Sequence, residues 1–217
     1  MKISNLILVI SLLSSSMAFS QQQTLFMNLG KPLTTQKSTN TNGSVYLNAD
    51  FQKGTVTTAD GKELRGIDIR YDMLNQHIEY NSGDNAYDIT DMVSKLDMLS
   101  EMENHTGKLI KVQILDMKAP AFLELVYADT ISIYKLNTLK VESDEDFYTK
   151  KVIKKYVPSN TFYILSNNTF QKIGSTKKDF QSAFKENEHA KSILNSSDFN
   201  FGIDASIINL GKAINGR

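Results

Sequence analysis

The chain contains no cysteine. A protein without cysteine has no disulfide, no thiolate ligand for zinc, no catalytic thiol and no cysteine to carry a lipid anchor. Its stability must then come from a hydrophobic core, and residues 21–217 are enough chain for one domain of ordinary size.

The chain has no excess of either sign of charge, because 24 lysine and arginine residues balance 24 aspartate and glutamate residues. No block of basic residues with interleaved aromatic residues stands out. The nearest is the segment TKKVIKKY at residues 149–156, which suits an edge strand with protective lysines at least as well. We therefore predict that neither nucleic acid nor an anionic membrane is a partner.

Long hydrophobic runs are also lacking, since no stretch after residue 20 approaches the roughly 20 apolar residues of a transmembrane helix. At the N-terminus, Lys2 precedes a shorter apolar stretch from Leu6 to Leu13, and small residues follow at Ala18 and Ser20. This is the layout of a secretory signal peptide. We predict cleavage after Ser20 and export to the periplasm or the cell exterior, with neither a lipid anchor nor a transmembrane segment afterwards.

The motifs of common catalytic and cofactor sites are missing. There is no Gly-x-Ser-x-Gly motif and no phosphate-binding glycine loop. The histidines His77, His105 and His189 are not spaced like metal ligands. The acidic stretches 81–91 and 142–148 could bind calcium weakly, but neither fits the EF-hand loop. We predict no cofactor and no metal site, and we favour a protein that is not an enzyme.

What the sequence does contain is a series of strand patterns, the clearest of them at residues 54–80. Asp60-Gly61 predicts a tight hairpin turn, and Gly66 predicts a β-bulge. The following residues alternate between apolar and charged side chains, as a half-buried strand does. We predict that Ile67, Ile69 and Tyr71 face the core. Asp68 and Arg70 are predicted to lie on the opposite, solvated face of the strand.

Further alternating segments follow, separated by predicted turns at residues 72–76, 81–85, 128–130 and 167–168. Sequential strands joined by short loops usually pair with their neighbours, so these segments predict an antiparallel meander. Residues 92–104 fit a helix as well as a strand followed by a loop, and both alternatives stay open. The charged segment VESDEDFYTKK, residues 141–151, is predicted to be a solvated loop.

Near Thr176 the apolar period becomes helical. Thr176 and Asp179 have the spacing of a capping box. Phe180, Ala183 and Phe184 then lie at helical spacing and predict the apolar side of a helix.

A second helical segment is predicted at residues 204–214. Ile207, Leu210 and Ile214 lie along one side, and Asp204 is a plausible N-cap. We therefore expect a pair of helices packed on the sheet.

Together these patterns predict a mainly β protein with a helical C-terminus, of the α+β class. Its antiparallel sheet could curl toward a sandwich or an open barrel, with one or two C-terminal helices packed on it. The predicted organisation is a signal peptide at residues 1–20, a flexible polar leader at 21–43, an antiparallel β domain at 44–174 and a C-terminal helical segment at 175–217.

The candidate binding residues are Asp68, Arg70 and Glu79, on the polar face of two neighbouring predicted strands. Asp68 and Glu79 could be cross-strand neighbours, and two acids across a cleft are what a glycosidase needs. Arg70 shares their face, however, and mixed charge on the outside of a half-solvated sheet is the ordinary outcome. We therefore expect a solvated surface, which could bind a partner, and predict no catalytic residues.

The segments FQKGTVTTADGKELRGIDIRYDMLNQHIEY, FLELVYADTISIYK and TFYILSNNTFQKIGSTKKDF resemble a group of uncharacterised secreted β-rich proteins from Bacteroidota. The resemblance covers most of the chain after the signal peptide. It implies a β-rich protein of the envelope or periplasm, and it transfers no catalytic residue.

Two functional hypotheses remain. The first is a non-catalytic binding or assembly module of the bacterial envelope, which would engage another envelope protein, a glycan or a small apolar ligand. The second is a carboxylate-dependent hydrolase of glycans or peptides, with acids drawn from several loops. A deep cleft with a carboxylate buried beside another acid would favour the hydrolase, whereas an open exposed face would favour the binding module.

Overall fold

A computed structural model describes residues 30–33, 41–98, 105–114, 117–145, 148 and 150–216. The predicted signal peptide lies outside the described residues, as does most of the predicted leader. The described leader residues include two short strands, β1 (Lys31–Pro32) and β2 (Thr41–Asn42).

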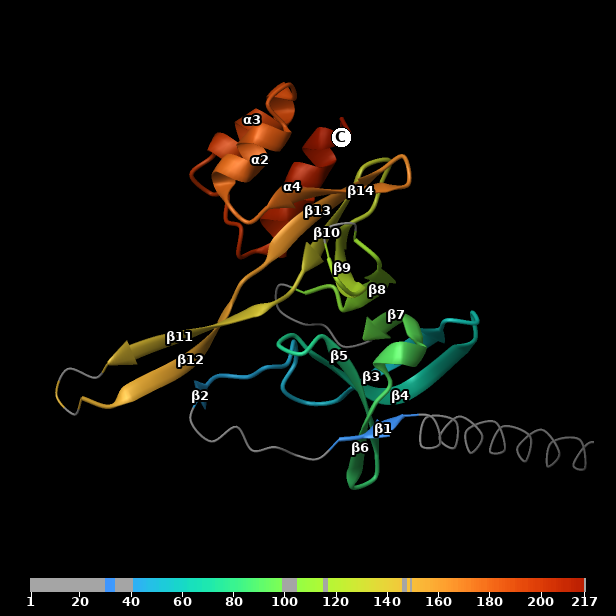
Figure 1. Cartoon of the computed structure of the whole chain (residues 1–217). Coiled ribbons are helices and arrows are strands. Elements are labelled where there is room, and N and C mark those ends of the chain that lie inside the picture. The colour runs from blue at the N-terminus through green and yellow to red at the C-terminus, as the bar shows by residue number, and fades with distance from the viewer. Residues whose placement is uncertain are drawn as a thin grey trace, which may run out of the picture.

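The protein is mainly β, as predicted, and is built on one large open sheet (Figure 1). Every pairing in this sheet is antiparallel. Its eleven strands lie in the spatial order β1, β6 (Asn85–Asp88), β5 (His77–Ser82), β4 (Glu63–Asp72), β3 (Gln52–Thr58), β7 (Val93–Met98), β8 (Lys108–Val112), β9 (Ala121–Tyr127), β10 (Ser132–Leu136), β13 (Thr161–Ser166) and β14 (Thr169–Gly174).

The strand order departs from a simple meander at three points, where β1 pairs with β6, β3 pairs with β7 and β10 pairs with β13. A meander would place β7 beside β6, but β7 pairs with β3 instead. The chain returns through a short 3-10 helix, η1 (Thr90–Met92), and the Met92 carbonyl accepts a hydrogen bond from the Ala59 N–H. The described part of the ambiguous segment is therefore this turn followed by a strand.

The charged segment at residues 141–151 is not simply a solvated loop, which corrects the prediction. Its residues 141–145 belong to the strand β11 (Leu139–Glu145), which pairs with β12 (Val152–Pro158) to form a hairpin of two seven-residue strands. An ion pair links Glu142 to Lys155 across the two strands, and Glu145 pairs with Lys150 just before β12, so the charges support pairing. The hairpin extends away from the large sheet and forms a second sheet in which β2 pairs with β12 in parallel (Figure 1).

The predicted turns are confirmed by their backbone geometry. Gly61 has φ +84° in the β3–β4 turn, and Asn167 and Asn168 have φ of +50° and +59° between β13 and β14. Gly66 has φ +68° and is the extra residue of a bulge, because Gly54 pairs with Ile67 and Thr55 pairs with Arg65. Beyond the bulge, Ile67, Ile69 and Tyr71 are buried as predicted.

Three helices follow the sheet, one more than the largest number predicted: α2 (Lys177–Ala183), α3 (Glu188–Asn195) and α4 (Asp204–Ile214). Polar N-cap residues divide the predicted first helix in two, because the Asn187 side chain accepts a hydrogen bond from the Ala190 N–H and so starts α3. Phe180 and Phe184 are buried, whereas Ala183 is exposed.

The helices cover one end of the sheet, over β9, β10 and β13 (Figure 1). Buried side chains of the helices and strands form one shared cluster there: Val126, Ile133, Phe162, Phe180, Phe184, Ala190, Leu194, Ile207 and Leu210. A second core lies around β3, β4, β5 and β7 and reaches Leu109 and Phe122. The sheet face between these two cores is where the main polar cluster lies.

The predicted capping box at the start of α2 is present. The Thr176 hydroxyl accepts a hydrogen bond from the Asp179 N–H, and the Asp179 carboxylate accepts one from the Thr176 N–H. We expect Thr176→Ala to lower the free energy of unfolding by about 1 kcal/mol, because the helix loses this cap. Urea denaturation would measure the loss, and Thr176→Ser should retain most of the stability. Equal losses in both variants would contradict the capping explanation.

Candidate functional site

The three candidate binding residues do not form one group. Arg70 and Glu79 are cross-strand partners, and the Glu79 carboxylate accepts hydrogen bonds of 2.6 and 3.1 Å from the Arg70 guanidinium. Asp68 instead forms an exposed ion pair with Lys53 on the opposite neighbouring strand. Asp68 and Glu79 are therefore not directly opposed, since Glu79 pairs with Arg70.

The face that carries Arg70 and Glu79 is not solvated, contrary to the prediction. The chain before β3 crosses it, and the Arg70 guanidinium lies 3.5 Å from the ring centroid of Tyr46 and 4.2 Å from that of Phe51. Such cation–π contacts hold the guanidinium between two rings. Glu79 is buried beneath them. The pair therefore fastens residues 46–51 to the sheet and is not open to a ligand.

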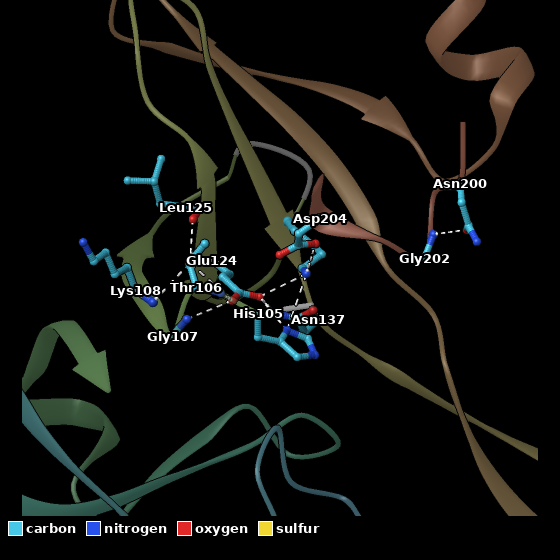
Figure 2. Close-up of polar contacts among 11 residues, drawn as sticks. His105, Thr106, Gly107, Lys108, Glu124, Leu125, Asn137, Asn200, Gly202 and Asp204 are labelled. Carbon is cyan, nitrogen blue, oxygen red and sulfur yellow. Dashed lines mark hydrogen bonds and ion pairs between the residues drawn. The ribbon is translucent and has the colours of Figure 1, made fainter. Parts of the chain in front are cut away.

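The most densely bonded polar group is Glu124, on β9. Its side chain is fully buried, yet donors from two other parts of the chain reach it. One carboxylate oxygen accepts hydrogen bonds from the N–H groups of Thr106 and Gly107, at 2.6 and 3.1 Å. The other accepts a 2.8 Å bond from the Asn137 side-chain amide and lies 2.9 Å from His105 Nδ1 (Figure 2).

A lysine places the balancing positive charge beside Glu124. Lys135 on β10 is the direct cross-strand partner of Glu124, and its ammonium lies 3.3 Å from the Glu124 carboxylate. The same ammonium donates a 2.7 Å hydrogen bond to Asp204, the first residue of α4. We call Glu124, Lys135, Asp204, His105 and Asn137 the buried polar cluster.

The acids of the buried polar cluster have opposite pKa shifts. Burial alone would raise the pKa of Glu124, but the His105 hydrogen bond, the Lys135 charge and the Asn137 amide together lower it to about 2. Asp204 is different, because its burial outweighs the attraction of Lys135 and raises its pKa. Glu124 is therefore an ionised structural acceptor at neutral pH.

Asp204 is not the helix cap that the sequence predicted. Its side chain makes no capping bond to the start of α4 and is directed instead to Lys135. The buried Asp204 Oδ2 and Asn137 Oδ1 atoms have no hydrogen-bond partner in the described part of the chain. The buried polar cluster thus joins α4 to the sheet, although two of its buried oxygen atoms accept no hydrogen bond within the described residues.

A hydrogen-bonded link connects the cluster to the other half of the sheet. Gln76, in the β4–β5 turn, donates a 2.9 Å hydrogen bond to the Asn137 carbonyl. Its side-chain carbonyl accepts a 2.5 Å bond from the buried Tyr71 hydroxyl. Gln76 has φ +59°, so the turn adopts a left-handed conformation at this point. The cluster therefore lies where β4, β9, β10 and α4 are tied together.

Sequence reasoning missed this cluster, although a signal for it exists. Glu124 is the single charge in AFLELVY, and Lys135 is the single charge in SIYKL. A lone charge in each of two apolar strand segments indicates a buried pair, because an isolated buried charge is costly. Nothing in the sequence near His105 or Asp204 points to the same place.

A separate groove of about 580 Å³ lies on the other face of the sheet. Residues of five adjacent strands, β3, β4, β7, β8 and β9, line it: Thr55, Thr57, Glu63, Arg65, Lys95, Leu96, Asp97, Lys108, Leu109, Ile110 and Leu125. We call it the outer groove. Threonine and aliphatic side chains lie beside charged ones here, so the outer groove offers hydroxyls, apolar contacts and charge together.

The charges of the outer groove include three basic and two acidic side chains. Arg65 is paired with Glu63 at 2.6 Å, so this basic group is already partly neutralised. Lys95 and Lys108 form no ion pair within the described residues and are exposed. These two lysines are therefore the charged groups most available to a ligand.

Over the residues that the structure describes, no three histidine, cysteine, aspartate or glutamate side chains are grouped so that they could hold a metal ion. The helices in this part of the chain include none that is long and apolar enough to cross a membrane. Comparisons with protein-family models, with curated proteins and with solved structures find no match.

Proposed function

We propose that this chain is an exported, non-catalytic binding module of the bacterial envelope, and that the outer groove binds a segment of another envelope protein. The N-terminal pattern of Lys2, an apolar stretch and small residues supports export. The observation that carries the binding proposal is the outer groove itself, which lies across five strands beside two exposed, unpaired lysines.

The composition of the outer groove favours a polypeptide ligand. Both signs of charge, two threonine hydroxyls and aliphatic side chains are presented together, and none of its lining residues is aromatic. An acidic extended segment would bring carboxylates to Lys95 and Lys108 while its apolar side chains contact Ile110 and Leu125. Such electrostatic complementarity speeds association and selects among partners.

The hydrolase alternative draws some support from Glu124 and Asp204, because a pair of acids with opposite pKa shifts is a common catalytic arrangement. Their surroundings weigh against it. Both acids contact the same buried ammonium, Glu124 is fully buried, and neither lines the outer groove. A substrate would have to displace the internal hydrogen bonds of Glu124 to reach it.

The experiment is a quantitative pull-down from detergent-solubilised envelope extract with three immobilised proteins. These are the wild type, Lys95→Glu/Lys108→Glu in the outer groove, and Lys177→Glu/Lys178→Glu on exposed residues of α2. We expect the wild type and the α2 variant to retain the same partner. The groove variant should bind it about tenfold more weakly or worse, because two attractive contacts become repulsive.

Equal retention by all three proteins would contradict binding in the outer groove. Partner loss in both variants would show dependence on net charge alone and would also count against the proposal. Retention only by the wild type and the α2 variant, at several salt concentrations, is the result that the proposal requires.

A further inference from the structure

The β11–β12 hairpin carries most of the large hydrophobic residues that are exposed in the described chain. Six large hydrophobic residues are exposed in the described chain as a whole. Four of them belong to this hairpin and its tip: Val141, Tyr148, Val152 and Ile153. Val141 is 50% exposed and Val152 is 63% exposed. A two-stranded hairpin has little core of its own, so this apolar surface is available to a partner.

The outer edge of β11 is open. β11 is the terminal strand of the smaller sheet, and in the described part of the chain it pairs only with β12. The far side of such a strand presents backbone N–H and C=O groups to solvent. An added strand can pair with these groups, which is how several peptide-binding domains recognise extended segments.

Charge determines what kind of strand this edge can accept. β11 carries Glu142, Asp144 and Glu145 against a single lysine, Lys140. Each copy of β11 therefore carries a net negative charge, and this repulsion disfavours pairing between two copies along this edge. The neighbour that β11 already has, β12, carries Lys154 and Lys155, and Lys155 forms a 3.5 Å ion pair with Glu142.

We propose that the free edge of β11 is a second interaction site, which binds an extended basic segment of a partner protein as an additional antiparallel strand. The incoming lysines or arginines would neutralise Asp144, which forms no ion pair in the described residues, and would share Glu142 with Lys155 and Glu145 with Lys150. Alternate apolar side chains of the added strand would cover Val141. This site is separate from the outer groove and does not depend on it.

The test uses a synthetic peptide with the sequence of residues 150–158, KKVIKKYVP, because residues 152–158 already pair with β11 inside the protein. Its binding to the full chain is followed by fluorescence anisotropy at low and moderate salt. We expect saturable binding that weakens as salt is raised. A control peptide in which the four lysines are glutamates should not bind the wild type.

Charge reversal identifies the site. Glu142→Lys/Asp144→Lys should weaken binding of the basic peptide by at least about tenfold and should allow the glutamate peptide to bind. Binding of the glutamate peptide by this variant would show that its hairpin is folded. The matched control, Glu186→Lys/Asp198→Lys, reverses two exposed acids in the helical region and should bind like the wild type.

Three results would overturn the proposal. One is no saturable binding of the basic peptide to the wild type, and another is equal loss of binding in the hairpin variant and its matched control. The third is concentration-dependent dimerisation of the wild type in sedimentation that the hairpin variant abolishes, because the edge would then pair with a second copy.

Discussion

Replacing Lys135 with methionine should lower the free energy of unfolding by about 3–5 kcal/mol. The substitution keeps the length of the side chain but removes the ammonium that lies 3.3 Å from Glu124 and 2.7 Å from Asp204. Both carboxylates would then lie in the interior without their shared positive charge. Removing one partner of a buried ion pair is costly because the remaining charge stays desolvated.

Urea denaturation of Lys135→Met, Asp204→Asn and the double variant measures this effect. The loss in the double variant should be smaller than the sum of the two single losses, because each removes the same contact. Lys172→Met, at an exposed position of β14, is the matched control and should change stability by less than about 0.5 kcal/mol. A full loss in the control, or additive losses in the cycle, would count against the buried pair.

Lowering the pH should also reduce the free energy of unfolding, because Glu124 becomes protonated. The pKa of Glu124 is about 2 in the folded protein, compared with 4.5 for the unperturbed group. A lowered pKa in an acid means that its contribution is fully present above pH 4.5 and is lost as the pH falls toward 2. The size of the shift corresponds to about 3 kcal/mol over this range.

The measurement is the free energy of unfolding from urea titrations between pH 2.5 and 6, for the wild type and Glu124→Gln. The variant should lack most of the acid-dependent loss, because glutamine does not titrate. The raised pKa of Asp204 acts in the opposite direction, since the folded state binds that proton more readily and gains relative stability as pH falls. Parallel profiles for the two proteins would show that Glu124 does not control the acid response.

The sequence predicted best where local chemistry decides the structure. Asp60-Gly61 and Gly66 supply backbone conformations that few other residues adopt readily, so the turn and the bulge were predictable. Alternation of apolar residues placed Ile69 and Tyr71 in the core. The capping box of Thr176 and Asp179 is equally local, because all its bonds form within four residues.

The predictions failed where distant segments decide the structure. Arg70 and Glu79 were expected on a solvated face, but the rings of Tyr46 and Phe51 cover the guanidinium, and strand alternation does not show this. The pairing of β7 with β3 likewise joins segments that three other strands separate in the chain. The charged residues of β11 looked like a loop because their ion-pair partners, Lys150 and Lys155, come later in the chain.

The candidate sites could be predicted only in part. Glu124 and Lys135 each interrupt an apolar strand, so their pairing could have been inferred from sequence. The contact between Asp204 and Lys135 could not have been inferred from sequence, because an aspartate at the start of a helix ordinarily acts as a cap. The outer groove depends on five strands lying side by side, and no short segment of the sequence contains it.

The ion pair between Lys135 and Asp204 also has a consequence for the order in which the protein can mature. The two residues are separated by 69 positions, and synthesis proceeds from the N-terminus, so the strands around Lys135 exist before Asp204 has been made. Until α4 arrives, the ammonium lacks its contact with Asp204, and the apolar side chains that α4 covers remain exposed. Such partly assembled chains are prone to aggregation. The docking of α4 therefore completes the ion pairing of Lys135 and the covering of this apolar cluster in one step.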